Sequence, residues 1–227
     1  MLKGVVGFIA AGLWTSAACA ADLTTTEARW LQGVWPVVVY AREAKLPLDI
    51  VVQPQPSPGA APLALAFIEG RCKLVLSMRG NAQAQATLDR LAPELLDAAL
   101  ELMAAHELGH CRRYLDGAWY RLPSGFAASP SDTPAAQWQH AYASMQAARR
   151  EEAYGDLVGL AWTRQRHPQL YEKLHAWLVK ERSDDVIPGS HHDTRAWLRL
   201  AGDGRALMQP SIFGAAAALW TDGLAED

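Results

Sequence analysis

The alternation of apolar and polar residues beyond residue 22 predicts a region of short strands that follows one helix. Thr24 and Glu27 form a capping box, which predicts a first helix that runs to about residue 45 and breaks at Pro36. Short runs rich in β-branched and other apolar residues then predict three strands, at residues 48–53, 63–68 and 72–78. The last two runs are separated by Glu-Gly-Arg at 69–71, which is typical of a hairpin turn.

The rest of the chain carries longer helical patterns. Strong helix formers predict a helix over residues 92–115, and further helices are predicted at 135–166, 169–182, 195–201 and 211–223. Strands followed by helices indicate an α+β fold, with a small, mostly antiparallel sheet and a mainly helical C-terminal half. Between these blocks, residues 116–134 are rich in Gly, Pro, Ser and Asp, and are interpreted either as a lid or binding loop or as a simple connection.

Length and charge limit the classes of protein that fit. The chain has 227 residues, half of them hydrophobic, which suffices for a single domain over residues 21–227. The net charge is only -3, and the basic residues are scattered rather than clustered. A nucleic-acid partner is therefore not expected.

The first 20 residues have the pattern of a signal peptide. Lys3 precedes an apolar run over residues 4–14, and Ala18-Cys19-Ala20 matches an A-x-A cleavage site. Lipidation at Cys19 is a weaker alternative, because Ser16 stands three residues before it. The run is too short to span a bilayer, so we expect export to the periplasm or the medium without a transmembrane anchor.

Export changes the interpretation of the remaining cysteines. Without residues 1–20 the chain keeps two of them, Cys72 and Cys111. An even pair in an oxidising compartment indicates a disulfide between the strand at 72–78 and the helix at 92–115. Two free, buried thiols are the alternative.

The strongest chemical motif in the chain is His106-Glu107-Leu108-Gly109-His110. On a helix, His106 and His110 are i,i+4 neighbours on one face, where their two imidazoles can hold one metal ion. Glu107 is rotated by about 100° from His106, so it is placed to take a proton from a water at the metal rather than to ligate. Cys111 lies off this face and is a poor ligand candidate.

A third ligand is predicted on the helix at 135–166. Glu152 and Asp156 are i,i+4 neighbours, which predicts Glu152 as the ligand and Asp156 as the hydrogen-bond acceptor of a ligating histidine. Glu151 is the main rival for the ligand position. Gly155 and Gly159 lie on or beside the same face, where small residues permit a close approach to the helix that carries the histidines.

The combination of His106-Glu-x-x-His110 with Glu152-x-x-x-Asp156 resembles the gluzincin zinc metallopeptidases. The nearest pattern is that of the HtpX-like and CaaX-protease-like enzymes and their soluble periplasmic relatives, although Tyr154-Gly155 replaces the usual Ala before Asp156. The resemblance covers mainly residues 92–160. It implies a zincin-like fold, Zn²⁺, hydrolysis of peptide bonds, and a peptide or protein substrate that pairs with a sheet edge at residues 72–78.

The same resemblance implies a downstream histidine near the metal. Ser190-His-His-Asp-Thr-Arg195 is similar to the family's segment, and His191 is carried over as a group that hydrogen-bonds the tetrahedral oxyanion, with His192 or Arg195 as alternatives. Three other histidines have no matching partners and are interpreted as surface or partly buried residues: His140, His167 and His175.

The sequence therefore predicts an exported zinc endopeptidase with ligands His106, His110 and Glu152 and the general base Glu107. The alternative function is a non-catalytic zinc-containing periplasmic binding or assembly factor whose metal site is occluded or structural. A catalytic site keeps one zinc position open, whereas a structural site is closed by a fourth protein ligand.

Overall fold

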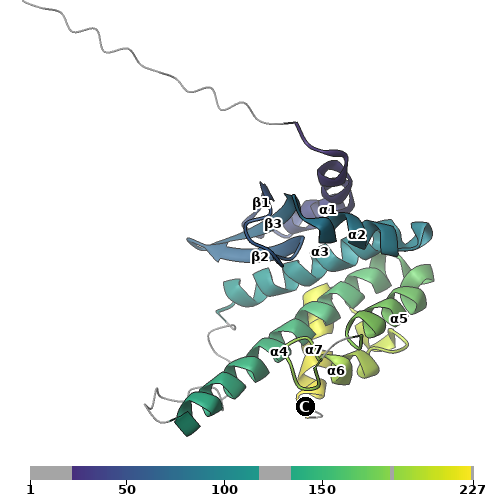
Figure 1. The fold of residues 1–227 in the computed structure, drawn as a ribbon. Helices are drawn as coiled ribbons and strands as arrows, with labels where there is room; N and C mark the ends of the chain where they lie inside the picture. Colours follow the sequence, from purple (N-terminus) through teal and green to yellow (C-terminus); the bar gives the residue numbers. More distant parts are fainter. Residues whose placement is uncertain (1–21, 118–133, 185–186, 226–227) are drawn as a thin grey trace, which may run out of the picture.

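The computed structural model describes residues 22–117, 134–184 and 187–225, with side chains of the second range described from residue 142 (Figure 1). The predicted signal peptide at 1–20 lies outside the described residues, as does most of the segment at 116–134. The described part has an α+β architecture in which a three-stranded sheet and a helix cross one side of a central helix and further helices cover the other (Figure 1).

Helix α1 (Thr25–Glu43) begins at the predicted capping box. The hydroxyl of Thr24 accepts a bond from the Glu27 backbone N–H at 3.1 Å, and the Glu27 carboxylate accepts one from the Thr24 N–H at 2.7 Å. The predicted break at Pro36 is wrong, because the helix continues through it. A proline inside a helix costs about 3 kcal/mol. The same helix buries four large or medium apolar side chains on both sides of Pro36, Trp30, Val34, Val37 and Val38, and each contributes about 1.5–3 kcal/mol, which together outweighs that cost.

The sheet is mixed rather than mostly antiparallel. It consists of β1 (Leu48–Pro54), β2 (Leu63–Ile68) and β3 (Arg71–Arg79), in the order β1-β3-β2. β2 and β3 form the predicted hairpin, with Glu69 and Gly70 both at positive φ, as a two-residue turn requires. β1 pairs with β3 in parallel. The long loop after β1 leads to β2 at the opposite edge of the sheet, and the hairpin then brings β3 back between β1 and β2.

This order also corrects the predicted sheet edge. β3 lies in the centre of the sheet, so residues 72–78 already pair on both sides. Among the described residues β2 pairs only with β3, which leaves its outer edge open. The prediction failed because the turn signal at 69–71 shows which strands are neighbours but not where β1 joins them.

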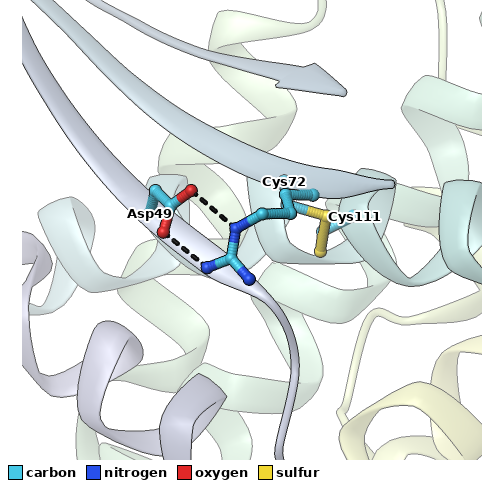
Figure 2. Close-up of a disulfide and its surroundings, with 4 residues drawn as sticks. Asp49, Cys72 and Cys111 are labelled. Carbon is cyan, nitrogen blue, oxygen red and sulfur yellow. Dashed lines mark hydrogen bonds and ion pairs between the residues drawn. A yellow bond between two sulfur atoms is a disulfide. The ribbon is translucent and has the colours of Figure 1, made fainter. Parts of the chain in front are cut away.

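A disulfide joins the sheet to the central helix. Cys72 of β3 and Cys111 of α3 (Pro93–Leu115) are bonded, with their Cα atoms 5.6 Å apart, and both are fully buried (Figure 2). The predicted bridge is confirmed. Beside it, Arg71 donates two bonds to the carboxylate of Asp49, at 2.9 and 2.6 Å, which connects β3 to β1 (Figure 2).

The remaining helices follow the predicted pattern closely. They are α4 (Pro134–Arg166), α5 (Tyr171–Glu181), α6 (Arg195–Leu200) and α7 (Ile212–Gly223), with short 3-10 turns at Pro168–Leu170 and Arg205–Leu207. One helix was missed, α2 (Ala82–Arg90), although its N-cap Asn81 accepts a bond from Gln83 N–H and gave a local signal. No helix in the described ranges is long and apolar enough to cross a membrane.

Candidate metal centre

His106 and His110 lie one turn apart in the central part of α3. Both are buried, and their Nε2 atoms are 3.0 Å apart. The helix around them is built from Ala and Leu, which favour helix and pack into the core on both sides. The two rings are edge-on to each other, at 88° between their planes.

Glu152 of α4 completes the cluster. Its Oε2 lies 3.5 Å from His106 Nε2, and its Oε1 lies 3.5 Å from His110 Nε2. Two ligand atoms at about 2.1 Å from a tetrahedral zinc lie about 3.4 Å from each other. The observed separations of 3.0 and 3.5 Å are close to that value, so this set of two nitrogens and one carboxylate fits a zinc ion.

Glycines let α3 and α4 approach closely enough for this meeting. A Cβ atom added at Gly155 would lie 2.8 Å from the ring of His106, and one at Gly109 would lie 3.2 Å from the Cα of Gly155. A Cβ at Gly159 would lie 2.9 Å from the backbone oxygen of Leu102. The small residues singled out in the sequence therefore lie at the points where the two helices touch.

Asp156 fixes the orientation of His106. Its Oδ1 accepts a hydrogen bond from His106 Nδ1 at 2.9 Å, and its side chain is fully buried. Because Nδ1 donates this bond, Nε2 is the ring nitrogen that faces Glu152 and His110, and it can ligate a metal ion once its own proton has left. Asp156 thus lies where it was predicted, hydrogen-bonded to the candidate ligand His106.

The charges of the cluster shift one another's pKa values. Burial lowers the pKa of His106, but the carboxylates of Asp156 and Glu152 raise it to about 10. Burial raises the pKa of Glu152, and the two histidines more than reverse this, so its pKa lies well below the usual range. The pKa of Asp156 is also lowered, because Arg182 and His106 outweigh the effect of its burial.

Glu107 faces the same cavity as the cluster. The cavity has a volume of about 500 Å³, and residues of β2, α3, α4 and α5 line it. Its lining residues include the three candidate ligands and Glu107, and further side chains of mixed character: Leu65, Leu91, Met103, Tyr114, Trp177, Glu181, Arg182 and His192.

The rival ligand Glu151 points away from the cluster. Both of its carboxylate oxygens accept bonds from Arg113 Nε, at 3.1 and 2.8 Å, and the Glu151 side chain is fully buried. Arg113 in turn lies over the rings of Tyr154 and Trp220. The pair of Glu151 and Arg113 therefore connects α4 to α3 outside the cluster of candidate ligands.

Of the downstream histidines, His192 rather than His191 lines the cavity. His192 Nε2 lies 3.9 Å from Glu152 Oε2, and burial and the nearby Arg182 lower the pKa of His192. His191 is exposed and stacks obliquely on His192, with ring centroids 4.0 Å apart. Arg195 pairs with Asp193 at 2.6 Å instead of reaching the cluster.

The other histidines make local contacts. His167 Nε2 lies 3.0 Å from a Glu101 carboxylate oxygen, and His175 Nε2 lies 2.8 Å from the backbone oxygen of Leu198. The side chain of His140 lies outside those that the structure describes.

Two residues of the site were missed in the sequence. Arg182, the C-cap residue of α5, donates to the carboxylates of Glu152 and Asp156, and Thr194 Oγ1 donates to Asp156 Oδ2 at 2.6 Å. Nothing in the local sequence marks Arg182, because its partners lie 26 and 30 residues away. Thr194 lies in the segment at residues 190–195, where the sequence indicated only His191, His192 and Arg195 as candidates.

The chain was compared with protein-family models, with curated proteins and with solved structures, and none of them matches it.

Proposed function

We propose that this protein is a zinc-dependent endopeptidase that acts after export, in the periplasm or outside the cell. The observation that carries the proposal is the meeting of His106, His110 and Glu152, whose ligand atoms all lie within 4.8 Å of one another, in a cavity that also contains Glu107. Two histidines from one helix and a carboxylate from a second are the donor set of a gluzincin-type catalytic zinc site. A sheet packed against the helix that carries the histidines agrees with a zincin-like fold.

The residues divide the chemistry between them. When bound by the three ligands, Zn²⁺ would supply a Lewis acid and lower the pKa of a coordinated water toward neutrality. Glu107 takes the proton of the attacking water and delivers it to the leaving amine. Asp156 keeps His106 in the tautomer whose Nε2 can ligate. His192, which lines the cavity, replaces His191 as the histidine placed to hydrogen-bond the oxyanion.

The substrate is a peptide in extended form. Residues 61–65, which lead into and form the start of β2, line the cavity beside the candidate ligands. The outer edge of β2 offers backbone N–H and C=O groups to a substrate strand, and it takes the place of the edge expected at 72–78. A substrate strand paired with β2 would then present its scissile bond to Glu107.

Substitution of Glu107 tests this proposal. Purified Glu107→Gln protein is expected to keep the zinc content of the wild type and to lose cleavage of a peptide library by about a hundredfold or more, because the proton acceptor is gone. Glu94→Gln is the matched control, since Glu94 lies on the same helix and its side chain is 60% exposed. Cleavage by Glu107→Gln at the wild-type rate with normal zinc content would refute the mechanism.

One observation favours the non-catalytic zinc-binding or assembly factor as a second candidate. His192 Nε2 lies 3.9 Å from Glu152 Oε2, and although His192 is not part of the three-residue cluster, an inward movement of this half-exposed side chain would make it a fourth protein ligand. A site closed in that way would be structural. A hydroxamate that binds the zinc-loaded wild type, and binds His192→Ala no more tightly, would argue for an open site and against this candidate.

A further inference from the structure

Arg182 is the cation that touches both carboxylates of the candidate metal site. Its Nε donates to Asp156 Oδ2 at 2.9 Å, and its Nη2 donates to Asp156 Oδ1 at 2.7 Å and to Glu152 Oε2 at 3.3 Å. The Arg182 side chain is only 15% exposed, so these bonds are made largely out of water. A planar guanidinium that meets both oxygens of a carboxylate holds it in one orientation, which a lysine cannot do.

Asp156 has no freedom to rotate while these bonds exist. Oδ1 accepts from His106 Nδ1 and Arg182 Nη2, and Oδ2 accepts from Arg182 Nε and Thr194 Oγ1. Each oxygen thus accepts two bonds, and any turn of the carboxylate would break the bond to His106. The direction of His106 Nε2 is consequently set by Arg182, through Asp156.

Arg182 also balances the charge of a loaded site. Four carboxylates line the cavity: Glu107, Glu152, Asp156 and Glu181. A divalent cation together with the guanidinium groups of Arg182 and Arg90 carries four positive charges, so the formal sum is zero. A balanced set is favoured where burial limits screening by water.

We propose that Arg182 is a positioning residue of the metal site, whose planar guanidinium holds Asp156 and Glu152 in the arrangement that binds a divalent cation. The inference rests on the metal-binding part of the proposed function and does not require peptide cleavage. It assigns the effect to the geometry of the guanidinium as well as to its charge.

Zinc affinity tests this role directly. The metal-free protein is titrated with Zn²⁺ in competition with a chromophoric chelator, for wild type, Arg182→Lys and Arg182→Gln. Both variants are expected to bind Zn²⁺ at least about tenfold more weakly, as is typical when a partner of a ligand is removed. Absorption spectra of the Co²⁺-loaded proteins are expected to change in both variants, because the ligand geometry relaxes.

Arg71 supplies a matched control. It makes the same two-bond contact with Asp49 between β3 and β1, and it does not line the cavity (Figure 2). Arg71→Gln is expected to change the zinc affinity by less than about twofold, since an exposed pair contributes little and touches no ligand.

A double substitution covers the case in which Arg182→Gln fails to fold. Arg182→Gln combined with Asp156→Asn removes one positive and one negative charge and leaves no unpaired ion at this pair. In the Asp156→Asn background, loss of Arg182 is expected to weaken zinc binding by less than about threefold, because the main partner has already lost its charge.

The outcomes separate this inference from the proposed function. Wild-type zinc affinity in Arg182→Lys would overturn the geometric role, and equal losses in the two Asp156 backgrounds would overturn the action through Asp156. A wild type that binds no Zn²⁺ or Co²⁺ would overturn both the inference and the proposed function. Metal binding with the expected losses but without peptide cleavage would refute the peptidase and support Arg182 as a positioning residue.

Discussion

Gly155→Ala is the sharpest test of how the site is assembled. The added methyl group would lie 2.8 Å from Nδ1 and Cε1 of His106, whereas unstrained contacts between carbon atoms lie at about 3.5–4.0 Å. The ring must therefore move by about 0.7 Å. A displacement of that size would lengthen the 2.9 Å bond from His106 Nδ1 to Asp156 beyond the range of a hydrogen bond.

The magnitudes decide the sign of the effect. Alanine favours a helix over glycine by about 1 kcal/mol. Against this, overpacking costs about 1–3 kcal/mol, and a lost hydrogen bond to a charged group costs about 1.5–3 kcal/mol. The net result is a loss of about 1.5–5 kcal/mol of stability in the metal-free protein. Zinc affinity should fall by more than about tenfold, since metal–ligand distances tolerate only about 0.2 Å.

Urea unfolding and zinc titration of the variant measure both effects. Gly214→Ala is the matched control, because its added methyl group would lie no closer than 3.6 Å to the surrounding atoms and Gly214 does not line the cavity. That control should be up to about 1 kcal/mol more stable than wild type, with unchanged zinc affinity. If Gly155→Ala behaved like Gly214→Ala in both assays, close contact at Gly155 would not be what places His106.

Three further predictions follow from the same structure. Glu152→Gln removes an anionic ligand, so zinc affinity measured by chelator competition should fall by more than the 10–100-fold that is typical when a residue hydrogen-bonded to a ligand is lost. An unchanged zinc affinity would exclude Glu152 as a ligand. Replacing Cys72 and Cys111 together by serine opens a loop with a sequence separation of 39 residues and should cost about 4 kcal/mol in urea unfolding; a cost below about 1 kcal/mol would contradict it. Hydrogen bonds from Arg79 and Thr24 lower the pKa of Glu27 below its ordinary 4.5, so the stability that Glu27 adds is complete above pH 4.5 and is lost as the pH falls through the lowered pKa. The difference in unfolding free energy between wild type and Glu27→Gln should therefore shrink below pH 4.5, and a constant difference down to pH 2 would refute the assignment.

Local signals in the sequence were sufficient for most helices and strands. The capping box at Thr24 and Glu27, the turn at Glu69 and Gly70, and Pro168, which begins a 3-10 turn, each act within a few residues. The break expected at Pro36 failed for the opposite reason, because burial of the helix face on both sides outweighs a local cost. Strand order failed too, since the pairing of β1 with β3 leaves no local mark.

Part of the candidate site could be predicted from sequence spacing, and part could not. Sequence spacing alone put His106 and His110 on one helix face, and put Glu152 and Asp156 on another, because helical geometry fixes which residues share a face. Glu151 and Glu152 are chemically identical, so only the spacing to Asp156 favoured Glu152 in the sequence; the structure adds that Arg113 binds the carboxylate of Glu151. Sequence spacing could not find Arg182.

What the sequence determined about this protein is everything that depends on neighbours within about one turn of helix or one hairpin: the elements, the spacing of the histidines and the glycines that permit contact. Tertiary structure alone decided which residues from distant segments meet. Arg182 joins Asp156 and Glu152 because the packing of α5 against α4 brings its side chain to their carboxylates, and a buried charge is stable only where an opposite one is within bonding distance.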